Sequence, residues 1–210
     1  MAAVSSAKEA ILKKIRQALS NPVPLPFPQS EGVQTVYKAA RDDDAIIFAE
    51  EFTKLQGKFA FCENQTDLQA QLSLLIQQQG FTKIHCIETS LLPLLHNLSI
   101  EPYNDLPGCD VSITTCEYLV ARTGSIVMSS AQQSGRTSSV YAPIHICIAY
   151  NSQLLFDVKD ALVFLKEKYS GNFPSFITFS TGPSRTADIE KTLVTGVHGP
   201  KEVYCFLVEN

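Results

Sequence analysis

Short apolar runs alternate with segments of helical periodicity over most of this chain, and this alternation limits the possible folds more than any other feature. Leu68, Leu72 and Leu75 have helical spacing, and their segment ends at Gly80. Apolar, strand-like runs stand on either side of it. Alternating strands and helices are typical of parallel α/β architecture. The sequence therefore predicts an α/β fold with a mainly parallel sheet and helices on both faces.

The boundaries of the expected elements follow from periodicity and from the placement of glycine and proline. We expect a short helix and a loop in 90–110, and a helical turn at 116–120. The longer helices are expected at 40–55, 68–76 and 157–169, the first ending at Gly57. Strands are expected at 58–62, 83–87, 111–114, 125–129, 144–150, 175–180 and 203–208.

The chain begins with a helical segment and a proline-rich arm. Ile11 and Ile15 lie on the apolar face of the expected helix, and proline occupies every second position in 21–28. We therefore expect an N-terminal helix and arm at 1–30 and a single α/β domain at 31–210. A surface helix that docks on the domain or on a second subunit is the favoured interpretation of the first segment; a membrane-surface helix is the alternative.

Composition excludes several classes of function. The net charge is −4, there is no tryptophan, and no basic stripe is present, so nucleic acid is not an expected partner. No apolar run approaches the roughly 18 residues that a membrane span needs, and the first residues lack the apolar core of a signal peptide. We expect a cytoplasmic protein.

The six cysteines do not have the spacing of a metal site. No Cys-x-x-Cys pair occurs, so neither a zinc site nor an iron–sulfur cluster is expected, and we predict no metal. Four of them, Cys62, Cys86, Cys147 and Cys205, lie in apolar strand-like runs, where a reduced thiol packs as a small hydrophobe. No Gly-x-Gly-x-x-Gly follows an expected strand, so no cofactor is expected in this chain.

Two loops in the second half of the chain collect small and polar residues. The first contains Thr123, Gly124 and Ser125, and a Thr-Gly turn lets a ligand approach backbone amides closely. The second, 132–139, carries Arg136 among serine, threonine and glutamine side chains that can hydrogen-bond an anion. A mobile surface loop is the alternative for this second segment.

A third loop is the most informative. Residues 181–190 leave an apolar run, turn at Gly182 and offer Ser184 or Thr186 as the N-cap of a short helical turn, with Asp188 and Glu190 in its first turns. Ligands of parallel α/β proteins bind at strand ends, and Arg185 is suited to clamp a carboxylate or phosphate. The equal alternative is that Arg185 pairs internally and locks the turn.

Two candidates for acid–base chemistry remain. His198 and Gly199 lie in a glycine-rich segment before the last expected strand, and histidine can exchange protons near neutral pH. Glu117 is the one carboxylate considered as a nucleophile or base. A structural histidine and a carboxylate on a helix surface are the more common outcomes for such residues.

Four stretches together resemble the C components of the lactate-utilisation (LUD domain) family. They are ARTGSIVMSS at 121–130, APIHICIAY at 142–150, TGPSRTADIE at 181–190 and LVTGVHGP at 193–200. The resemblance implies the fold of the sugar-isomerase, CoA-transferase and cyclo-ligase group (NagB/RpiA/CoA transferase-like). It also implies a part in oxidising L-lactate to pyruvate beside iron–sulfur partner proteins.

Three functions follow from these observations. The first is a cluster-free accessory component of L-lactate utilisation that binds a small anionic ligand. The second is a stand-alone enzyme on a phosphorylated or carboxylated small molecule, which needs Arg122, Arg136, Arg185 and His198 to converge. The third is an interaction module that uses the N-terminal helix and arm.

Overall fold

The computed structural model describes residues 3–20, 43–189 and 192–209. Helix α1 (Ala3–Leu19) belongs to a first compact unit, and residues 40–210 form a second. The expected arm at 21–28 and the expected domain boundary at residue 30 lie outside the described residues. No helix among the described residues is both long and apolar enough to cross a bilayer.

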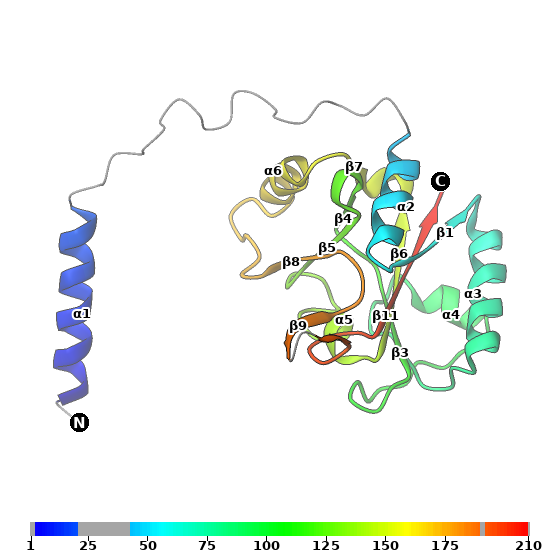
Figure 1. The fold of residues 1–210 in the computed structure, drawn as a ribbon, viewed down its shortest axis with the longest axis horizontal. Helices are drawn as coiled ribbons and strands as arrows, with labels where there is room; N and C mark the ends of the chain where they lie inside the picture. Colours follow the sequence, from blue (N-terminus) through cyan, green and yellow to red (C-terminus); the bar gives the residue numbers. More distant parts are fainter. Residues whose placement is uncertain (1–2, 21–42, 190–191, 210) are drawn as a thin grey trace. The chain divides into compact units, whose positions relative to one another are not determined.

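A five-stranded parallel sheet forms the centre of the second unit (Figure 1). Its strands stand in the order β1 (Lys58–Cys62), β11 (Glu202–Val208), β6 (Ile144–Tyr150), β3 (Val111–Thr114) and β2 (Ile84–His85). All four neighbouring pairs are parallel, which confirms the predicted fold class.

Helices α3 (Gln65–Gln79) and α4 (Leu92–Asn97) cover one face of this sheet. Leu68 and Leu72 of α3 are completely buried against Ile146 and Ile148 of β6. The side chain of Asn64 caps α3 by accepting hydrogen bonds from two amides of its first turn, and Gly80 ends the helix in the left-handed conformation.

The other face carries helix α2 (Asp44–Lys54) and a second, mixed sheet. This sheet has the strand order β7 (Leu154–Leu155), β4 (Tyr118–Val120), β5 (Ser125–Ser129) and β8 (Ile177–Ser180). Helix α6 (Val158–Lys168) packs on its outer side through Ala161 and Leu165. Helices therefore lie on both faces of the parallel sheet, as predicted.

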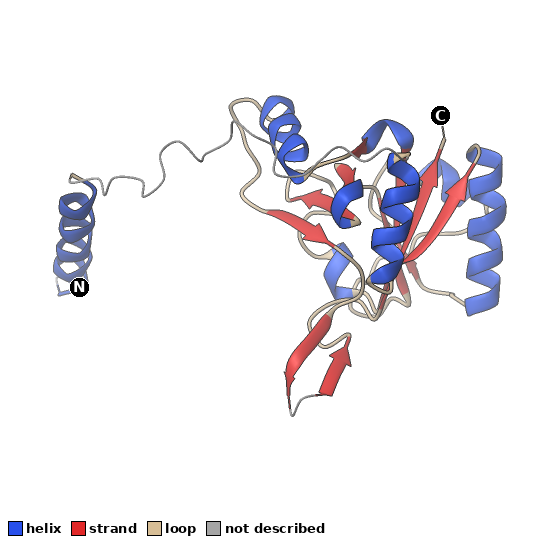
Figure 2. Ribbon diagram, turned by 45° about the horizontal axis from the view of Figure 1, so that its top comes forward, coloured by secondary structure: helices blue, strands red, loops and turns tan. Residues whose placement is uncertain are grey.

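Short elements connect these layers. They are η1 (Ala121–Thr123), α5 (Ser138–Tyr141), η2 (Asn151–Gln153) and a hairpin of β9 (Arg185–Ile189) and β10 (Thr192–Thr195). Figure 2 shows the hairpin projecting away from both sheets.

Three local predictions are wrong. The expected helical turn at 116–120 is instead strand β4, because residues 118–120 pair with 125–127 of β5. The expected helical turn after Ser184 is strand β9, because Arg185 and Thr186 pair with β10. The left-handed residue after α2 is Gln56, not Gly57. Glycine is needed at 57 because a Cβ there would lie 2.4 Å from the Phe52 ring.

Candidate functional site

A small cavity lies before the amino ends of β6 and β11. Its volume is about 230 Å³, and its walls come from β5, α5, β8 and the segments that follow β8 and precede β11. Four of the predicted binding residues line it: Gly182, Ser184, His198 and Gly199. A second hollow of about 370 Å³ shares Val140, His198 and Gly199 with it. His198 therefore borders both spaces.

Backbone hydrogen bonds hold the walls of this cavity together. The amide of Ser184 donates to the carbonyl of Pro200 at 2.9 Å, and the amide of Gly196 donates to the carbonyl of Ser184 at 2.9 Å. A Cβ at Gly199 would lie 2.9 Å from the Ser184 Cβ, so glycine lets the two segments approach. The polar side chains of the lining residues are the His198 imidazole and the hydroxyls of Ser139, Thr178, Ser180, Thr181 and Ser184.

Two of the three Thr-Gly pairs, 123–124 and 181–182, pack against the end of α2. Gly124 has φ +57°, and a Cβ there would lie 2.4 Å from the backbone nitrogen of Phe52. Gly182 has φ +123°, and a Cβ there would lie 2.6 Å from the Leu55 carbonyl oxygen. Thr123 and Ser125 hydrogen-bond each other through their hydroxyls at 2.7 Å. The space beside Gly124, expected to admit a ligand, is therefore filled by the backbone of α2.

The predicted arginines do not converge on the cavity. Arg122 bonds Asp157 at 2.9 Å, and Asp157 also caps α6 by accepting from the Lys159 amide. The Arg122 hydrogen bond is the main reason that the pKa of Asp157 lies below its usual value. Arg136 donates to the Ser175 hydroxyl at 2.6 Å and lies over the Phe176 ring.

Two predicted residues lie on the hairpin. The exposed Arg185 pairs with Thr195 in the β9–β10 register and is not among the described residues that line the cavity. Asp188 is also in β9, and its side chain lies outside the described part of the structure.

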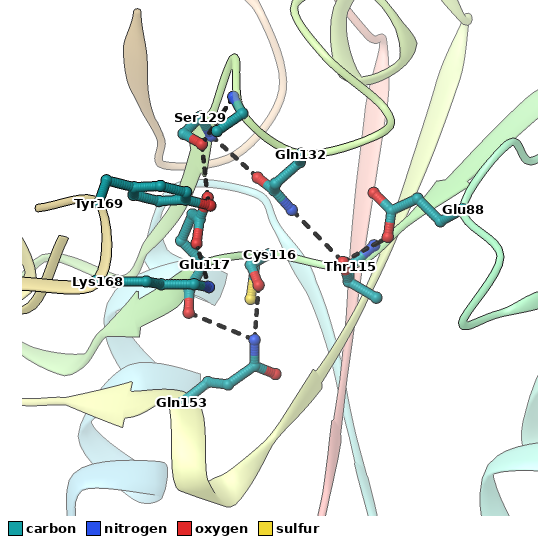
Figure 3. Close-up of polar contacts among 10 residues, drawn as sticks. Glu88, Thr115, Cys116, Glu117, Ser129, Gln132, Gln153, Lys168 and Tyr169 are labelled. Atoms are coloured by element: carbon teal, nitrogen blue, oxygen red, sulfur yellow. Dashed lines mark hydrogen bonds and ion pairs between the residues drawn. The ribbon is translucent and has the colours of Figure 1, made fainter. Parts of the chain in front are cut away.

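A buried carboxylate network follows the carboxyl end of β3 (Figure 3). Glu117 is 2% exposed and accepts hydrogen bonds from Ser129 Oγ at 2.5 Å and Tyr169 Oη at 2.7 Å. Lys168 Nζ lies 2.7 Å from its second oxygen. Burial alone lowers the pKa of Lys168, but the hydrogen bond and charge of Glu117 outweigh it and raise that pKa. Glu117 is therefore a buried, fully paired group, and its expected place on a helix surface is wrong.

A second buried carboxylate, Glu88, lies beside this network. One oxygen accepts from the Thr115 amide at 2.9 Å and from the Thr115 hydroxyl. Gln132 Nε2 reaches that hydroxyl at 3.4 Å, so the loop after β5 is tied to the same point. The other Glu88 oxygen is buried and has no hydrogen-bond partner in the described structure. Sequence reasoning missed Glu88, although its place just after the run 83–87 is a signal.

Buried polar groups also lie under α5. His145 is completely buried, and its Nε2 lies 2.9 Å from Thr114 Oγ1. Burial lowers the pKa of His145 to about 4, so the ring is neutral. The Thr114 hydroxyl donates to the Thr115 carbonyl, which leaves it to accept from Nε2–H. Nδ1 is therefore the unprotonated nitrogen of the neutral ring. It is buried and has no hydrogen-bond partner in the described structure.

All six cysteines are buried and unpaired. Burial raises the pKa of Cys62 to about 11, and it also raises that of Cys86 to about 11. The four cysteines that were expected to pack as small hydrophobes do so. Within the described ranges, no group of three or more His, Cys, Asp or Glu side chains is arranged to hold a metal ion.

Comparisons with known proteins agree on one family. The model of the LUD domain matches residues 100–208. A lactate utilization protein C from Bacillus licheniformis is 34% identical over 103 residues, which are 48% of this chain and 43% of that protein. The protein of the same name from Halalkalibacterium halodurans is 36% identical over 103 residues, 48% of this chain and 45% of that protein. The matched segment thus spans less than half the length of these relatives.

A solved structure supports the fold. The crystal structure of a DUF162 family protein from Deinococcus radiodurans superposes with a TM-score of 0.62 at 16% identity. The superposition covers 81% of this chain and 99% of that one.

Proposed function

Because this chain belongs to the LUD domain family, we propose that it is a cluster-free component of L-lactate utilisation that binds a small anionic ligand. The names of the relatives support the pathway. The cavity between Ser184 and His198 is the single observation that supports binding of a ligand. At about 230 Å³ it is smaller than most drug-sized pockets and suits a small metabolite.

The lining of the cavity favours a ligand with few negative charges. Its polar side chains are hydroxyls and one imidazole, and no Lys or Arg is among the described lining residues. A monocarboxylate with a hydroxyl or carbonyl group matches these donors better than a phosphate dianion, which is commonly bound by Arg and Lys. Lactate and pyruvate are ligands of this kind.

The pathway requires partners for electron transfer. We propose iron–sulfur proteins as these partners, since this chain has no Cys-x-x-Cys pair of its own. Six unpaired thiols are suited to a reducing compartment, and on that ground we propose a cytoplasmic location.

A thermal-shift panel tests the ligand. Lactate, pyruvate, a phosphorylated sugar, CoA and a folate are compared on wild type, His198→Asn and Arg185→Ala. Ligand at about 100 times its Kd adds roughly 2.7 kcal/mol, which raises Tm by roughly 5–10 °C in a domain of this size. We expect lactate or pyruvate to shift wild type and Arg185→Ala but not His198→Asn. An increase in Tm that persists in His198→Asn would show that the ligand binds outside the cavity.

Affinity purification from lactate-grown cells tests the partners. We expect iron–sulfur proteins to co-purify with the tagged chain and to give visible absorbance. A chain that is always recovered alone would refute the accessory role.

Although the arginines expected for it do not converge on the cavity, Glu88 favours a second candidate function, a stand-alone enzyme on a carboxylated or phosphorylated small molecule. It follows the carboxyl end of β2, where ligands of parallel sheets bind, and one of its buried oxygens lacks a donor among the described residues. Turnover of a panel substrate by the purified chain, lost in Glu88→Gln, would support this candidate over the first.

A further inference from the structure

Strand β1 is one of the two edge strands of the five-stranded parallel sheet, and β2 is the other. Strand β1 pairs with β11 on one side, and no described strand pairs with its other side. Monomeric proteins usually protect such an edge with proline, a bulge or a projecting charge. The sequence of β1, KFAFC, contains no proline, and its register with β11 is continuous over all five residues. Its charged residue, Lys58, is bonded to Glu202 and Tyr204 of β11.

The hydrogen bonds of β1 show which backbone groups face outward. The carbonyl of Cys62 accepts from the Glu209 amide at 2.9 Å, so Cys62 faces β11. Backbone groups alternate between the two sides of a strand, so those of Ala60 face β11 as well, and those of Phe59 and Phe61 face away from it. The Phe61 carbonyl accepts from the Gln71 side chain at 2.9 Å, which agrees with this direction.

Apolar side chains lie along the same edge. Phe61 is 41% exposed, and Leu74 of α3 is 55% exposed. A hollow of about 240 Å³ runs between the strand and the helix, and its lining includes Phe59, Ala60 and Leu74. Figure 1 shows β1 between α2 and α3 at the side of the sheet. This edge therefore combines outward-facing backbone groups with exposed apolar side chains, and of those groups the Phe61 carbonyl is held by Gln71.

The segment Phe59-Ala60-Phe61 reads the same in both directions, so two copies of it match when they pair antiparallel. This symmetry identifies a second copy of the chain as the partner of the edge. We propose that β1 pairs antiparallel with β1 of a second copy of this chain, about a two-fold axis through Ala60. In that register Phe59 of each copy faces Phe61 of the other. Both residues direct their amide and carbonyl outward, as the hydrogen-bonded pair of an antiparallel ladder requires. On pairing, the Phe61 carbonyl exchanges its bond from the Gln71 side chain for one from the Phe59 amide of the second copy. Ala60 forms the close, non-hydrogen-bonded pair on the axis, where a small side chain fits.

The side chains of this pairing also match. Phe59 and Phe61 share one face of the strand because they are two residues apart. Phe59 already packs edge-on against Phe48 of α2, with ring centroids 5.8 Å apart. Phe61 of the second copy extends this aromatic cluster and becomes buried, and cross-strand aromatic pairs stabilise sheets. The two parallel sheets then join into one continuous sheet across an isologous interface.

Sedimentation equilibrium on the full chain tests the association. We expect wild type to have twice the chain mass of 23.1 kDa and Phe61→Lys to have 23.1 kDa. Phe173→Lys is the matched control, because Phe173 is 50% exposed in the loop after α6. This variant should remain a dimer. A monomeric wild type, or a dimer that survives in Phe61→Lys, overturns the proposal.

Amide hydrogen exchange by NMR tests the register. The Ala60 and Cys62 amides face β11, so they should be protected in wild type and in Phe61→Lys. The amides at 59 and 61 should be protected in wild type and exchange rapidly in the variant. Rapid exchange at 59 and 61 in a dimeric wild type would place the interface elsewhere and overturn the pairing. Far-UV circular dichroism of Phe61→Lys confirms that the variant is folded, and Phe61→Ser replaces it otherwise.

Discussion

The two ends of the parallel sheet differ in how their polar groups are used. After the carboxyl ends of β2 and β3, the carboxylates of Glu88 and Glu117 are buried and bonded to the segment after β3, to β5 and to the end of α6. Before the amino ends of β6 and β11, small residues held by backbone hydrogen bonds enclose a cavity. A ligand needs space and available donors. In this protein the amino end supplies both, although the carboxyl end is the usual ligand site of parallel sheets.

This difference teaches that polarity alone does not identify a site. Glu117 is the most heavily hydrogen-bonded carboxylate of the network, yet its three partners occupy it fully. Such a group stabilises the joint between α6 and the second sheet. The cavity near Ser184 has weaker polarity and more room.

The largest expected effect is the loss of the Glu117 network. Glu117→Ala removes three hydrogen bonds to a buried charge and leaves a cavity, so it should destabilise the protein by about 3–5 kcal/mol. Urea unfolding followed by circular dichroism measures this loss. Tyr169→Phe removes a single one of these bonds and should cost about 1.5–3 kcal/mol. A loss under about 1 kcal/mol in Glu117→Ala would mean that the Glu117 hydrogen bonds do not stabilise the region after the carboxyl ends of β2 and β3.

The next effect separates packing from ligand binding at the first Thr-Gly turn. Gly124→Ala combines left-handed strain with overlap on the Phe52 backbone, so we expect a loss of about 3 kcal/mol. Gly135→Ala is the matched control, because Gly135 has φ +61° and open space around it. It should lose only about 1 kcal/mol. Equal losses in the two variants would show that α2 does not press on Gly124.

A third effect depends on pH. The pKa of His145 is about 4 in the folded protein and ordinarily 6.5. Between these values the unfolded chain binds a proton that the folded chain does not, so stability falls as the pH falls from 6.5 to 4. The full loss is about 3 kcal/mol, which is 2.5 pKa units at about 1.36 kcal/mol each. Unfolding free energies of wild type and His145→Gln over this range measure it. The exposed His96→Gln variant should keep the wild-type slope.

The smallest effect on stability is expected at the cavity. The hydrogen bonds that join Ser184 to its neighbours come from its backbone, so Ser184→Ala should change stability by less than about 0.5 kcal/mol. The same variant should weaken binding of the panel ligand about 5–10-fold, because one hydrogen bond is worth about 1 kcal/mol. Isothermal titration measures the binding. A large loss of stability in Ser184→Ala would show that this side chain stabilises the fold, as the buried carboxylates do at the other end of the sheet. The proposed difference between the two ends would then be wrong.

Local patterns predicted the parallel sheet well because each of its strands is an apolar run next to a helix. Five of the seven expected strands are the five strands of this sheet, although β2 is limited to Ile84–His85. The second sheet was harder. β4 has three residues and becomes a strand by pairing with β5 across a short turn, whereas β7 has two residues and pairs with β4, more than thirty positions away in the sequence. Periodicity in a short window does not contain that information.

The candidate site was predicted in part for a similar reason. Small residues near Ser184 and His198 are visible as a motif, and the structure brings them together. The partners of charged residues are not visible in a motif. Asp157 beside Arg122 and Ser175 beside Arg136 are both more than thirty positions away in the chain.

Because all six thiols are buried, their reactivity reports how often the native structure opens. A thiol-reactive dye needs the thiolate, and the native fold both covers these sulfurs and raises several of their pKa values. The rate of thiol labelling therefore measures how often the protein unfolds locally or globally. Cys62 and Cys86 belong to the core beneath α3, whereas Cys116, Cys147 and Cys205 belong to the core beneath α2. Mass spectrometry of partly labelled protein would thus reveal which layer separates first, without the introduction of any probe.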